Sequence, residues 1–513
     1  MAIGTAMSIG LIGLKAFVVQ MQAYISPGLP YFAIIGLPDA SVSEARERVK
    51  SACSSCGFHW PQTRVTVNLS PASLPKRGAT HDLAIAASVL AAGNMIPPGC
   101  LSNTLVLGEL NLDGTILPVN GILPMLLNAA SHHITRAFVP YANLEEASLV
   151  GSIDAVGLRH LGELIERMGG RPKYRLDATH APEQIMDPEI GPDAAPPRED
   201  LDMAQVVGQR TAKWALEVAA AGGHHMLMTG PPGSGKTMLA MRLPSIMPPL
   251  NDAEQLEVAS IRSLCGTLPM YGIREEPPFE APHHTATTAS LVGGGVGIAQ
   301  PGAVTRAHRG VLFMDEAPEF QPRTLQTLRE PLETGYVAIA RTRGTAYYPA
   351  RFLLAMASNP CPCGYASTGT GERCQCTPRE RARYRNRLSG PILDRIDIQI
   401  DVPQVPSPLA SDSERRETSA MVRRRVIQAR ATARERFRTQ GWASNAEASG
   451  QWLRRHTSQA ALNLVNDALD RNTLSLRGAD RALRLAWTIA DLAGRTSPDE
   501  TDVARGITLR TRE

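Results

Sequence analysis

The chain has 513 residues, of which 43% are hydrophobic and 20% charged, a composition typical of a globular protein with about two to four domains. Its net charge of +4 is too small to indicate a partner by itself. No uninterrupted apolar run reaches the roughly 18 residues that a membrane span needs. Eight cysteines in so long a chain do not indicate a disulfide scaffold, so we expect a cytoplasmic protein.

Residues 1–170 alternate short β-rich runs with helical ones and predict one mixed α/β domain. The apolar run that ends at Val19 predicts a strand, and the run from Asp82 to Ala92 predicts a helix. Asp113-Gly114, between two short apolar runs, predicts a β-hairpin. Residues 171–200 are rich in Pro, Asp and Glu and are expected to form a linker.

One later stretch matches the phosphate-binding pattern G-x-x-x-x-G-K-[ST] without a mismatch. An apolar run precedes it and a helical run follows, which is the strand–loop–helix context that the motif requires. Glycines let backbone N–H groups point at phosphate oxygens, while the lysine contacts the β/γ-phosphates and the threonine hydroxyl ligates Mg²⁺. The residues expected to bind ATP are Gly230, Pro231, Pro232, Gly233, Ser234, Gly235, Lys236 and Thr237.

Two carboxylates follow a strongly apolar run, residues 311–314, which predicts a buried parallel strand. We expect Asp315 to hold Mg²⁺ through water. Glu316 is expected to act as the general base that activates the attacking water.

Two further apolar runs, residues 352–358 and 396–402, predict additional strands. Asn359 follows the first of them, where a polar side chain can position the lytic water and sense the γ-phosphate. Four strands with polar residues at their ends, in this order, indicate an AAA+ ATPase core over residues 201–405.

Four cysteines lie close together after Asn359, as Cys361, Cys363, Cys374 and Cys376. Four thiolates on one loop suit a tetrahedral Zn²⁺ ion, although C-x-C pairs are tighter than the usual C-x₂-C. The alternative is four reduced surface thiols. By contrast, the adjacent pair His224-His225 has no third donor at metal-ligand spacing and is expected to be a surface or core feature.

Two arginines flank a predicted hairpin turn near residues 342–344. Arg341 and Arg343 would place positive charge at its tip, and we expect these side chains to contact DNA phosphates. Simple solvation of the two charges is the alternative. Residues 406–513 are basic and helical and predict a lid domain that packs one apolar face against the core.

Residues 67–83 and 119–123, which read VNLSPASLPKRGATHDL and VNGIL, resemble the Lon-protease-like domain. The resemblance implies an α/β fold of the ribosomal S5 type for residues 1–170. Lon proteases use a serine and a lysine, but the matching loop has no serine, and Ile122 and Leu123 stand where the lysine is expected. Thr80 could be proposed as a substitute, but a hydroxyl without a base is a weak nucleophile. A structural role, in oligomerisation or partner binding, is therefore expected.

Several motifs across the chain resemble the YifB/ComM family of magnesium-chelatase-like AAA+ ATPases. They are Phe279-Glu-Ala-Pro-His-His-Thr, Leu291-Val-Gly-Gly-Gly, Ala307-His-Arg-Gly-Val-Leu-Phe-Met-Asp-Glu, Ala357-Ser-Asn-Pro-Cys-Pro-Cys-Gly, Leu393-Asp-Arg-Ile-Asp and Ser475-Leu-Arg-Gly-Ala-Asp-Arg. The resemblance implies that Arg395 is an arginine finger for the ATP of a neighbouring subunit, and that Arg477 senses the nucleotide of its own subunit. An ion pair of Arg395 with Asp394 or Asp397 is the alternative.

The same resemblance implies a hexameric motor that uses ATP and Mg²⁺, acts on single-stranded or branched DNA, and drives branch migration during natural transformation. Two rival functions remain open. One is a magnesium chelatase motor subunit that drives metal insertion into a porphyrin, and the other is an ATP-driven chaperone that remodels proteins. The chelatase subunit lacks the Lon-like domain and the four-cysteine loop, which disfavours the first rival.

Overall fold

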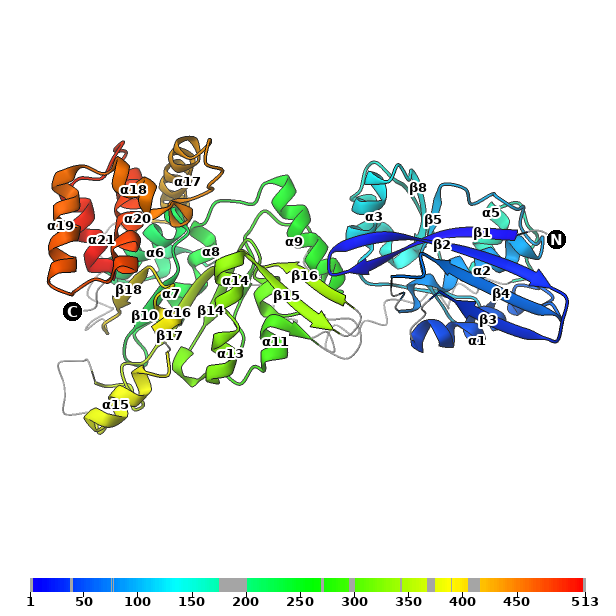
Figure 1. Cartoon of the computed structure of the whole chain (residues 1–513), viewed down its shortest axis with the longest axis horizontal. Coiled ribbons are helices and arrows are strands. Elements are labelled where there is room, and N and C mark those ends of the chain that lie inside the picture. The colour runs from blue at the N-terminus through cyan, green and yellow to red at the C-terminus, as the bar shows by residue number, and fades with distance from the viewer. Residues whose placement is uncertain are drawn as a thin grey trace.

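The computed structural model describes residues 3–36, 40–74, 76, 78–174, 201–268, 272–294, 300–341, 344–366, 374–388, 390–404 and 416–510. These residues form three parts along one long axis (Figure 1). A first domain, coloured blue to cyan, lies at one end, a central domain in green and yellow follows, and helices in orange and red form the other end. None of the described helices combines the length and the apolar character that crossing a bilayer requires.

The first domain contains a seven-stranded mixed sheet in the order β3-β4-β2-β1-β5-β8-β9. Its N-terminal run forms two antiparallel strands rather than one, because Gly13 adopts φ +66° and turns the chain between them. The strands are β1 (Ile3–Ile12), β2 (Lys15–Ser26), β3 (Tyr31–Ile35), β4 (Arg64–Ser70), β5 (Thr104–Val106), β8 (Arg136–Pro140) and β9 (Asp154–Leu158).

The most deeply buried helix of the first domain is α2, every residue of which is buried. It packs on β1 and β2 and against α1, which explains why its sequence is apolar on all sides. The predicted hairpin forms around Gly114 (φ +95°) from β6 (Glu109–Leu110) and β7 (Ile116–Leu117). The helices are α1 (Ala40–Ser55), α2 (Asp82–Ala92), α3 (Ile122–Ser131), α4 (Leu144–Ser148) and α5 (Leu161–Arg167).

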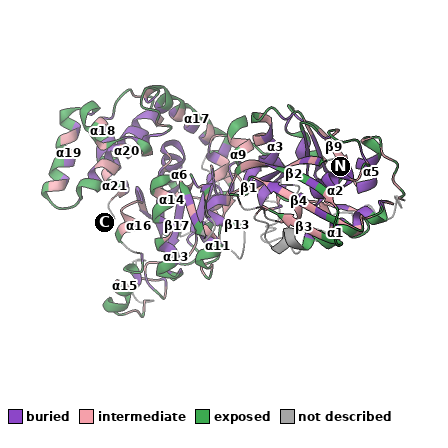
Figure 2. Ribbon diagram, turned by 45° about the vertical axis from the view of Figure 1, so that its right-hand side comes forward, coloured by how far each residue is buried: buried purple, intermediate pink, exposed green. Residues whose placement is uncertain are grey.

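The central domain is built on a five-stranded sheet in the order β11-β14-β17-β10-β18, in which all neighbouring strands are parallel. Every residue of β10, β14 and β17 is buried, while the exposed residues lie mainly on the surrounding helices (Figure 2). The four predicted strands are present, and β11 is an additional one. The bounds are β10 (Met226–Thr229), β11 (Phe279–Glu280), β14 (Val311–Met314), β17 (Leu353–Ser358) and β18 (Ile398–Asp401).

Helices and two short hairpins surround this sheet. The hairpin of β15 (Tyr336–Arg341) and β16 (Gly344–Pro349) contacts the first domain, where the carbonyl oxygen of Tyr347 lies against Gly13. The other hairpin pairs β12 (Gly293–Gly294) with β13 (Gln300–Pro301). The helices are α6 (Arg210–Gly222), α7 (Lys236–Met241), α8 (Leu243–Ile246), α9 (Asp252–Leu264), α11 (Thr288–Val292), α12 (Ala303–Arg306), α13 (Pro322–Gln326), α14 (Arg329–Thr334), α15 (Pro378–Arg385) and α16 (Gly390–Leu393).

The C-terminal part is helical and shares its core with the central sheet. Val422 of α17 and Leu485 of α20 belong to the same buried cluster as Met226 and Met228 of β10. This explains why the basic helix α17 keeps one apolar face. The helices are α17 (Ser419–Arg436), α18 (Gly450–His456), α19 (Gln459–Asp470), α20 (Leu476–Leu492) and α21 (Glu500–Arg510).

The first residues of the predicted linker are part of the described structure. Residues 171–174 belong to the first domain, since the backbone N–H of Lys173 donates to the carbonyl oxygen of Cys56 at 2.8 Å. The ring of Tyr174 also stacks on that of His160 at 4.9 Å. The rest of the predicted linker, residues 175–200, lies outside the described part of the chain.

Helix α9 connects the first and central domains. At its C-terminal end, the Ser263 hydroxyl donates a hydrogen bond to the buried carboxylate of Glu146. That carboxylate also accepts from the backbone N–H of Leu123 at 2.9 Å and from Asn143 at 3.2 Å. Burial raises the pKa of Glu146, and these donors act in the opposite direction. Glu146 therefore joins the domains through hydrogen bonds that water cannot easily replace.

Replacing Ser263 with alanine should destabilise the docked arrangement, because Glu146 loses one donor while it stays buried. The expected loss is about 1–2 kcal/mol, the cost of leaving a buried acceptor less satisfied. Differential scanning calorimetry and limited proteolysis would measure it, with Ser148→Ala as the matched control, since Ser148 is exposed and bonds only within its own helix. Equal melting temperatures for both variants would show that this contact does not hold the domains together.

Candidate nucleotide-binding site

The predicted phosphate-binding loop lies at the carboxyl end of β10 and leads into α7. Gly233 and Gly235 adopt φ values of +74° and +90°, which few other residues tolerate. At Gly230, a Cβ atom would lie 2.2 Å from the carbonyl oxygen of Val402, so the loop packs directly on the backbone just after β18. The glycines of the motif are therefore required by the backbone itself.

Lys236 points back into the loop and is only 8% exposed. Its ammonium group donates to the carbonyl oxygens of Gly230 at 2.6 Å and Pro231 at 2.9 Å, and to Oδ1 of Asn359 at 3.3 Å. Burial lowers the pKa of Lys236, and Asp315 and Glu316 oppose this effect. The structure thus brings together the predicted lysine and the predicted polar residue after β17.

The carboxylates after β14 lie beside the same loop. The Thr237 hydroxyl donates to Oδ2 of Asp315 at 2.6 Å, so two oxygen atoms of the kind that Mg²⁺ prefers are adjacent. Oδ1 of Asp315 accepts from the backbone N–H of Glu316 at 2.9 Å. Glu316 adopts φ +48°, and half of its side chain is exposed. The hydroxyl and carboxylate oxygens fit a magnesium ion, and Glu316 lies next to them.

One neighbour of Glu316 was not predicted. The Nδ1 atom of His284 lies 3.5 Å from Oε2 of Glu316, and its ring contacts that of His283 in a tilted arrangement with 4.0 Å between centroids. Both histidines follow the two-residue strand β11, which is too short to show a periodic pattern. The only signal in the sequence was the motif in which they occur.

The four clustered cysteines come together after β17. Their sulfur atoms all lie within 4.8 Å of one another, and Cys361 is buried while the other three are partly exposed. Of the two predicted DNA-binding arginines, Arg341 is the last residue of β15, and its side chain is outside what the structure describes. Arg343 lies outside the described residues.

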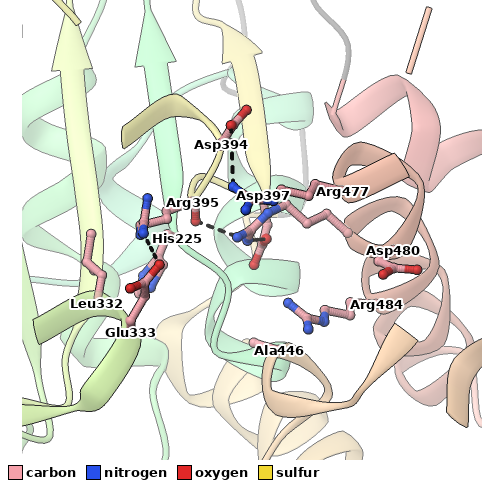
Figure 3. Close-up of a pocket in the computed structure, with 11 residues that line it drawn as sticks. His225, Leu332, Glu333, Asp394, Arg395, Asp397, Ala446, Arg477, Asp480 and Arg484 are labelled. Atoms are coloured by element: carbon pink, nitrogen blue, oxygen red, sulfur yellow. Dashed lines mark hydrogen bonds and ion pairs between the residues drawn. The ribbon is translucent and has the colours of Figure 1, made fainter. Parts of the chain in front are cut away.

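Arg395 and Arg477 line a pocket of about 290 Å³ at the junction of the central domain and α20, separate from the phosphate-binding loop (Figure 3). Arg395 is paired with Glu333 of α14, not with Asp394 or Asp397, and donates to the carbonyl oxygen of Pro391 at 2.5 Å. Its Nε atom is buried, and no described residue accepts a hydrogen bond from it. Burial, reinforced by neighbouring arginines, lowers the pKa of Arg395.

The side chain of Arg477 is 75% exposed and reaches Oδ2 of Asp394 at 3.8 Å. It therefore lies beside Arg395, and not beside the phosphate-binding loop of its own chain as the sequence led us to expect. The reason is the direction of the strands: Arg395 and Asp397 precede β18, whereas Lys236 follows β10, and the two strands are parallel neighbours. Arg395 and Arg477 therefore lie at the edge of the sheet formed by the amino ends of the strands, whereas Lys236 lies at the edge formed by their carboxyl ends.

Asp397 lies beneath this pocket and is 2% exposed. Its carboxylate accepts from His224 at 2.9 Å and is paired with Arg481 of α20. The other nitrogen of His224 lies 2.7 Å from the hydroxyl of Thr488, also in α20. Burial alone would raise the pKa of Asp397, but the hydrogen bond from His224 and the charge of Arg481 outweigh it and hold the pKa below its usual range.

The central sheet and the phosphate-binding loop define a P-loop ATPase of the AAA+ class. Family comparisons agree across most of the chain. Residues 202–409 match "Magnesium chelatase, subunit ChlI", residues 21–143 match "Subunit ChlI of Mg-chelatase", and residues 416–510 match "Magnesium chelatase, subunit ChlI C-terminal".

Relatives match over nearly the full length. An uncharacterised protein of Mycobacterium tuberculosis (strain ATCC 25618 / H37Rv) is 47% identical, with 99% of each chain covered. Competence protein ComM of Haemophilus influenzae is 37% identical over 99% of this chain and 98% of its own. The uncharacterised protein YifB of Salmonella typhimurium is 38% identical over 94% and 92%. The chain belongs to the YifB/ComM family of magnesium-chelatase-like AAA+ proteins.

A shorter similarity concerns Lon protease 2 of Bacillus subtilis, which is 32% identical over 149 residues. It covers 28% of this chain and 26% of the protease.

Membership of the magnesium-chelatase-like AAA+ family supports an ATPase motor.

Changing Asp397 to asparagine should lower the stability of the junction between the central and C-terminal domains strongly. Removing one partner of a buried ion pair leaves the other uncompensated, at a cost of about 3–5 kcal/mol. Urea denaturation followed by tryptophan fluorescence is suitable, because Trp487 lies in α20. Asp394→Asn is the matched control, since its weak pair with Arg477 is largely exposed and should be worth less than about 1 kcal/mol. Similar losses for both variants would contradict a special role for Asp397.

Proposed function

We propose that this protein is an ATP-hydrolysing ring motor that acts on DNA. The observation that supports it most directly is the placement of two sets of residues on opposite edges of one sheet. Lys236, Thr237 and Asp315 lie at the carboxyl edge, and Arg395 and Arg477 at the amino edge. In a head-to-tail assembly, the arginines of one subunit would face the nucleotide of the next.

Within one subunit, the loop would bind the phosphates of ATP. Lys236 has its ammonium group next to the loop carbonyls and would transfer its hydrogen bonds to phosphate oxygens. Thr237 and Asp315 would hold Mg²⁺, the second through water, and this ion supplies charge neutralisation between the β- and γ-phosphates. Glu316 would take the proton of the attacking water, and Asn359 would orient that water.

Between subunits, the arginine pocket would complete the site. The guanidinium of Arg395 lines this pocket, and its pair with Glu333 is open to solvent on the Glu333 side. An arginine whose ion pair can exchange its partner suits transient contact with a developing negative charge. We propose that Arg477, which is exposed in the same pocket, contacts the neighbour's nucleotide as well.

The first domain and the choice of DNA complete the proposal. The similarity to Lon protease 2 supports a Lon-like first domain, which here would serve assembly or partner binding. DNA as the substrate is supported by the similarity to a competence protein and by two arginines, Arg341 at the end of β15 and Arg343 two positions later in the sequence. We propose a hexamer that promotes branch migration of recombining DNA in natural transformation, with the C-terminal helices as its lid.

A second candidate is a chelatase motor, because the matching family descriptions name magnesium chelatase. Measuring ATP hydrolysis with forked DNA, single-stranded DNA or an unfolded protein separates the candidates. Stimulation by DNA alone would support the first. No stimulation by DNA, with stimulation by unfolded protein, would overturn it in favour of protein remodelling. No response to any of these would favour the chelatase reading, to be tested with a porphyrin-chelatase partner.

Arg395 acting on a neighbour's nucleotide predicts complementation between inactive subunits. Arg395→Ala should reduce kcat about 10³-fold, the usual value of an arginine finger, and Lys236→Ala should abolish ATP binding. Mixed rings contain interfaces at which an intact loop meets an intact arginine, so mixing the two variants should restore part of the ATPase rate.

Arg438→Ala serves as the control for this complementation, since Arg438 is 78% exposed and lies just after α17, outside the arginine pocket. It should hydrolyse ATP at the wild-type rate. If mixed Arg395→Ala and Lys236→Ala subunits, shown by native mass spectrometry to share rings, stay inactive, then Arg395 does not act on a neighbour.

The DNA assignment predicts that Arg341→Ala/Arg343→Ala loses DNA stimulation and keeps basal ATP hydrolysis. Two lost phosphate contacts should reduce the slope of log K against log salt by about 1.4 for single strands. Fluorescence anisotropy with labelled single strands at several salt concentrations would measure the slope, with Arg438→Ala as the control. An unchanged slope and unchanged stimulation would remove the hairpin from the DNA path.

A further inference from the structure

The four cysteines after β17 have the spacing of ligands around a single metal ion. The Sγ atom of Cys361 lies 3.3 Å from that of Cys363 and 3.7 Å from that of Cys374, and the last two are 3.6 Å apart. Tetrahedral zinc with Zn–S bonds of about 2.3 Å separates its sulfurs by about 3.8 Å. All four sulfurs lie within 4.8 Å of one another, so one ion can contact all of them.

Other uses of four cysteines fit this geometry less well. Disulfides would need sulfurs about 2.05 Å apart, and all eight cysteines are free thiols. A cluster of several irons and bridging sulfides needs its cysteines spread around a larger body than a single ion. A soft set of four thiolates selects Zn²⁺ over the hard cations that suit the nucleotide site.

The local backbone supports thiolate ligands. The N–H of Tyr365 donates to the sulfurs of both Cys361 and Cys363, and the N–H of Gln375 donates to Cys363. Such donors stabilise the negative charge that the sulfurs acquire when each ligating thiol gives up its proton to solvent. The second pair of cysteines leads into α15, whose first turn is capped by Thr377 and Glu380. Two separate chain segments are therefore held at one point.

The first pair lies directly against the phosphate-binding loop. Gly364 adopts φ +88°, and a Cβ atom there would lie 2.5 Å from Cδ of Pro232. The N–H of Gly364 donates to the carbonyl oxygen of Cys361 at 3.0 Å, which fixes this turn to the first sulfur ligand. On the other side, Asn359 accepts from Lys236. The segment from Asn359 to Gly364 thus contacts the phosphate-binding loop at two places.

We propose that Cys361, Cys363, Cys374 and Cys376 bind one Zn²⁺ ion, and that this ion braces the nucleotide site by holding the segment from Asn359 to Gly364 against the phosphate-binding loop. The metal site stands on the sulfur geometry alone, and its bracing role rests on the ATP site proposed above. Without the ion, four thiols have no common partner, and the turn at Gly364 loses its anchor.

Metal content tests the first half of this proposal. The full-length protein, purified under reducing conditions, should contain one zinc ion per chain when its metal content is measured by inductively coupled plasma mass spectrometry. Replacing Zn²⁺ with Co²⁺ should give the visible absorption bands of a tetrahedral thiolate site. Cys374→Ser/Cys376→Ser should lose the zinc, whereas Cys100→Ser, a change of a partly exposed cysteine outside the cluster, should keep it. Absence of zinc from the wild-type protein even after incubation with Zn²⁺, or iron in its place, would overturn the assignment.

Nucleotide affinity tests the second half. Wild-type protein stripped of zinc by a chelator should bind a fluorescent ATP analogue about tenfold more weakly, a change of about 1.4 kcal/mol, and added Zn²⁺ should reverse the loss. Gly364→Ala should keep its zinc and show a similar loss, because the added methyl displaces Pro232. Circular dichroism verifies that both samples remain folded.

The outcomes separate the two proposals. Unchanged nucleotide affinity in both the stripped protein and Gly364→Ala would overturn the brace. If the zinc-loaded wild-type protein carries its ion but binds no nucleotide, the proposed ATPase function fails while the metal site stands. Loss of affinity in both samples, with zinc retained only in Gly364→Ala, supports the brace.

Discussion

The contacts of the buried Asp397 carboxylate are the interaction that holds the central and C-terminal domains together. It accepts a hydrogen bond from His224, which lies just before β10, and forms an ion pair with Arg481 of α20. The carboxylate itself is almost completely buried. A charge in such surroundings is tolerated only while its partners are present. Because Asp397 follows Arg395 by two residues, and Arg481 also donates to the carbonyl oxygen of Arg395 at 3.1 Å, the network that joins the domains also positions the Arg395 loop.

Parallel strands give the central sheet two chemically different edges. The four residues of β18 span roughly 13 Å between them, so Arg395 lies well away from the loop of its own chain. No rearrangement of side chains alone would bring that arginine to Lys236. A site that uses both groups requires a second copy, and a head-to-tail contact of this kind closes into a ring when the rotation permits. The distribution of residues over the two edges is thus a constraint on assembly.

Sequence patterns gave reliable predictions where a local rule determines the structure. The bounds of α2 and the P-loop were predicted because apolar continuity and glycine spacing are local properties. The strand β11 was missed, since two residues carry no periodicity. The place of Arg477 beside Arg395 was not foreseen, because a motif gives a residue type and not the end of the sheet at which the residue lies. The pairing of His224 with Asp397, far apart in the chain, depends on tertiary burial that no local pattern encodes.

Helix α9 shows how the first domain is physically tied to the nucleotide site. One end of it carries Ser263, bonded to Glu146, and its middle carries Glu257, which accepts from His308 at 3.0 Å and from Arg309 at 2.9 Å. Those two residues lie just before β14, the strand that delivers Asp315 and Glu316. A helix of 13 residues is stiff and about 20 Å long. A movement of the first domain would therefore be passed through α9 to the residues just before β14. Helix α9 therefore gives the first domain a mechanical connection to the strand that precedes Asp315 and Glu316.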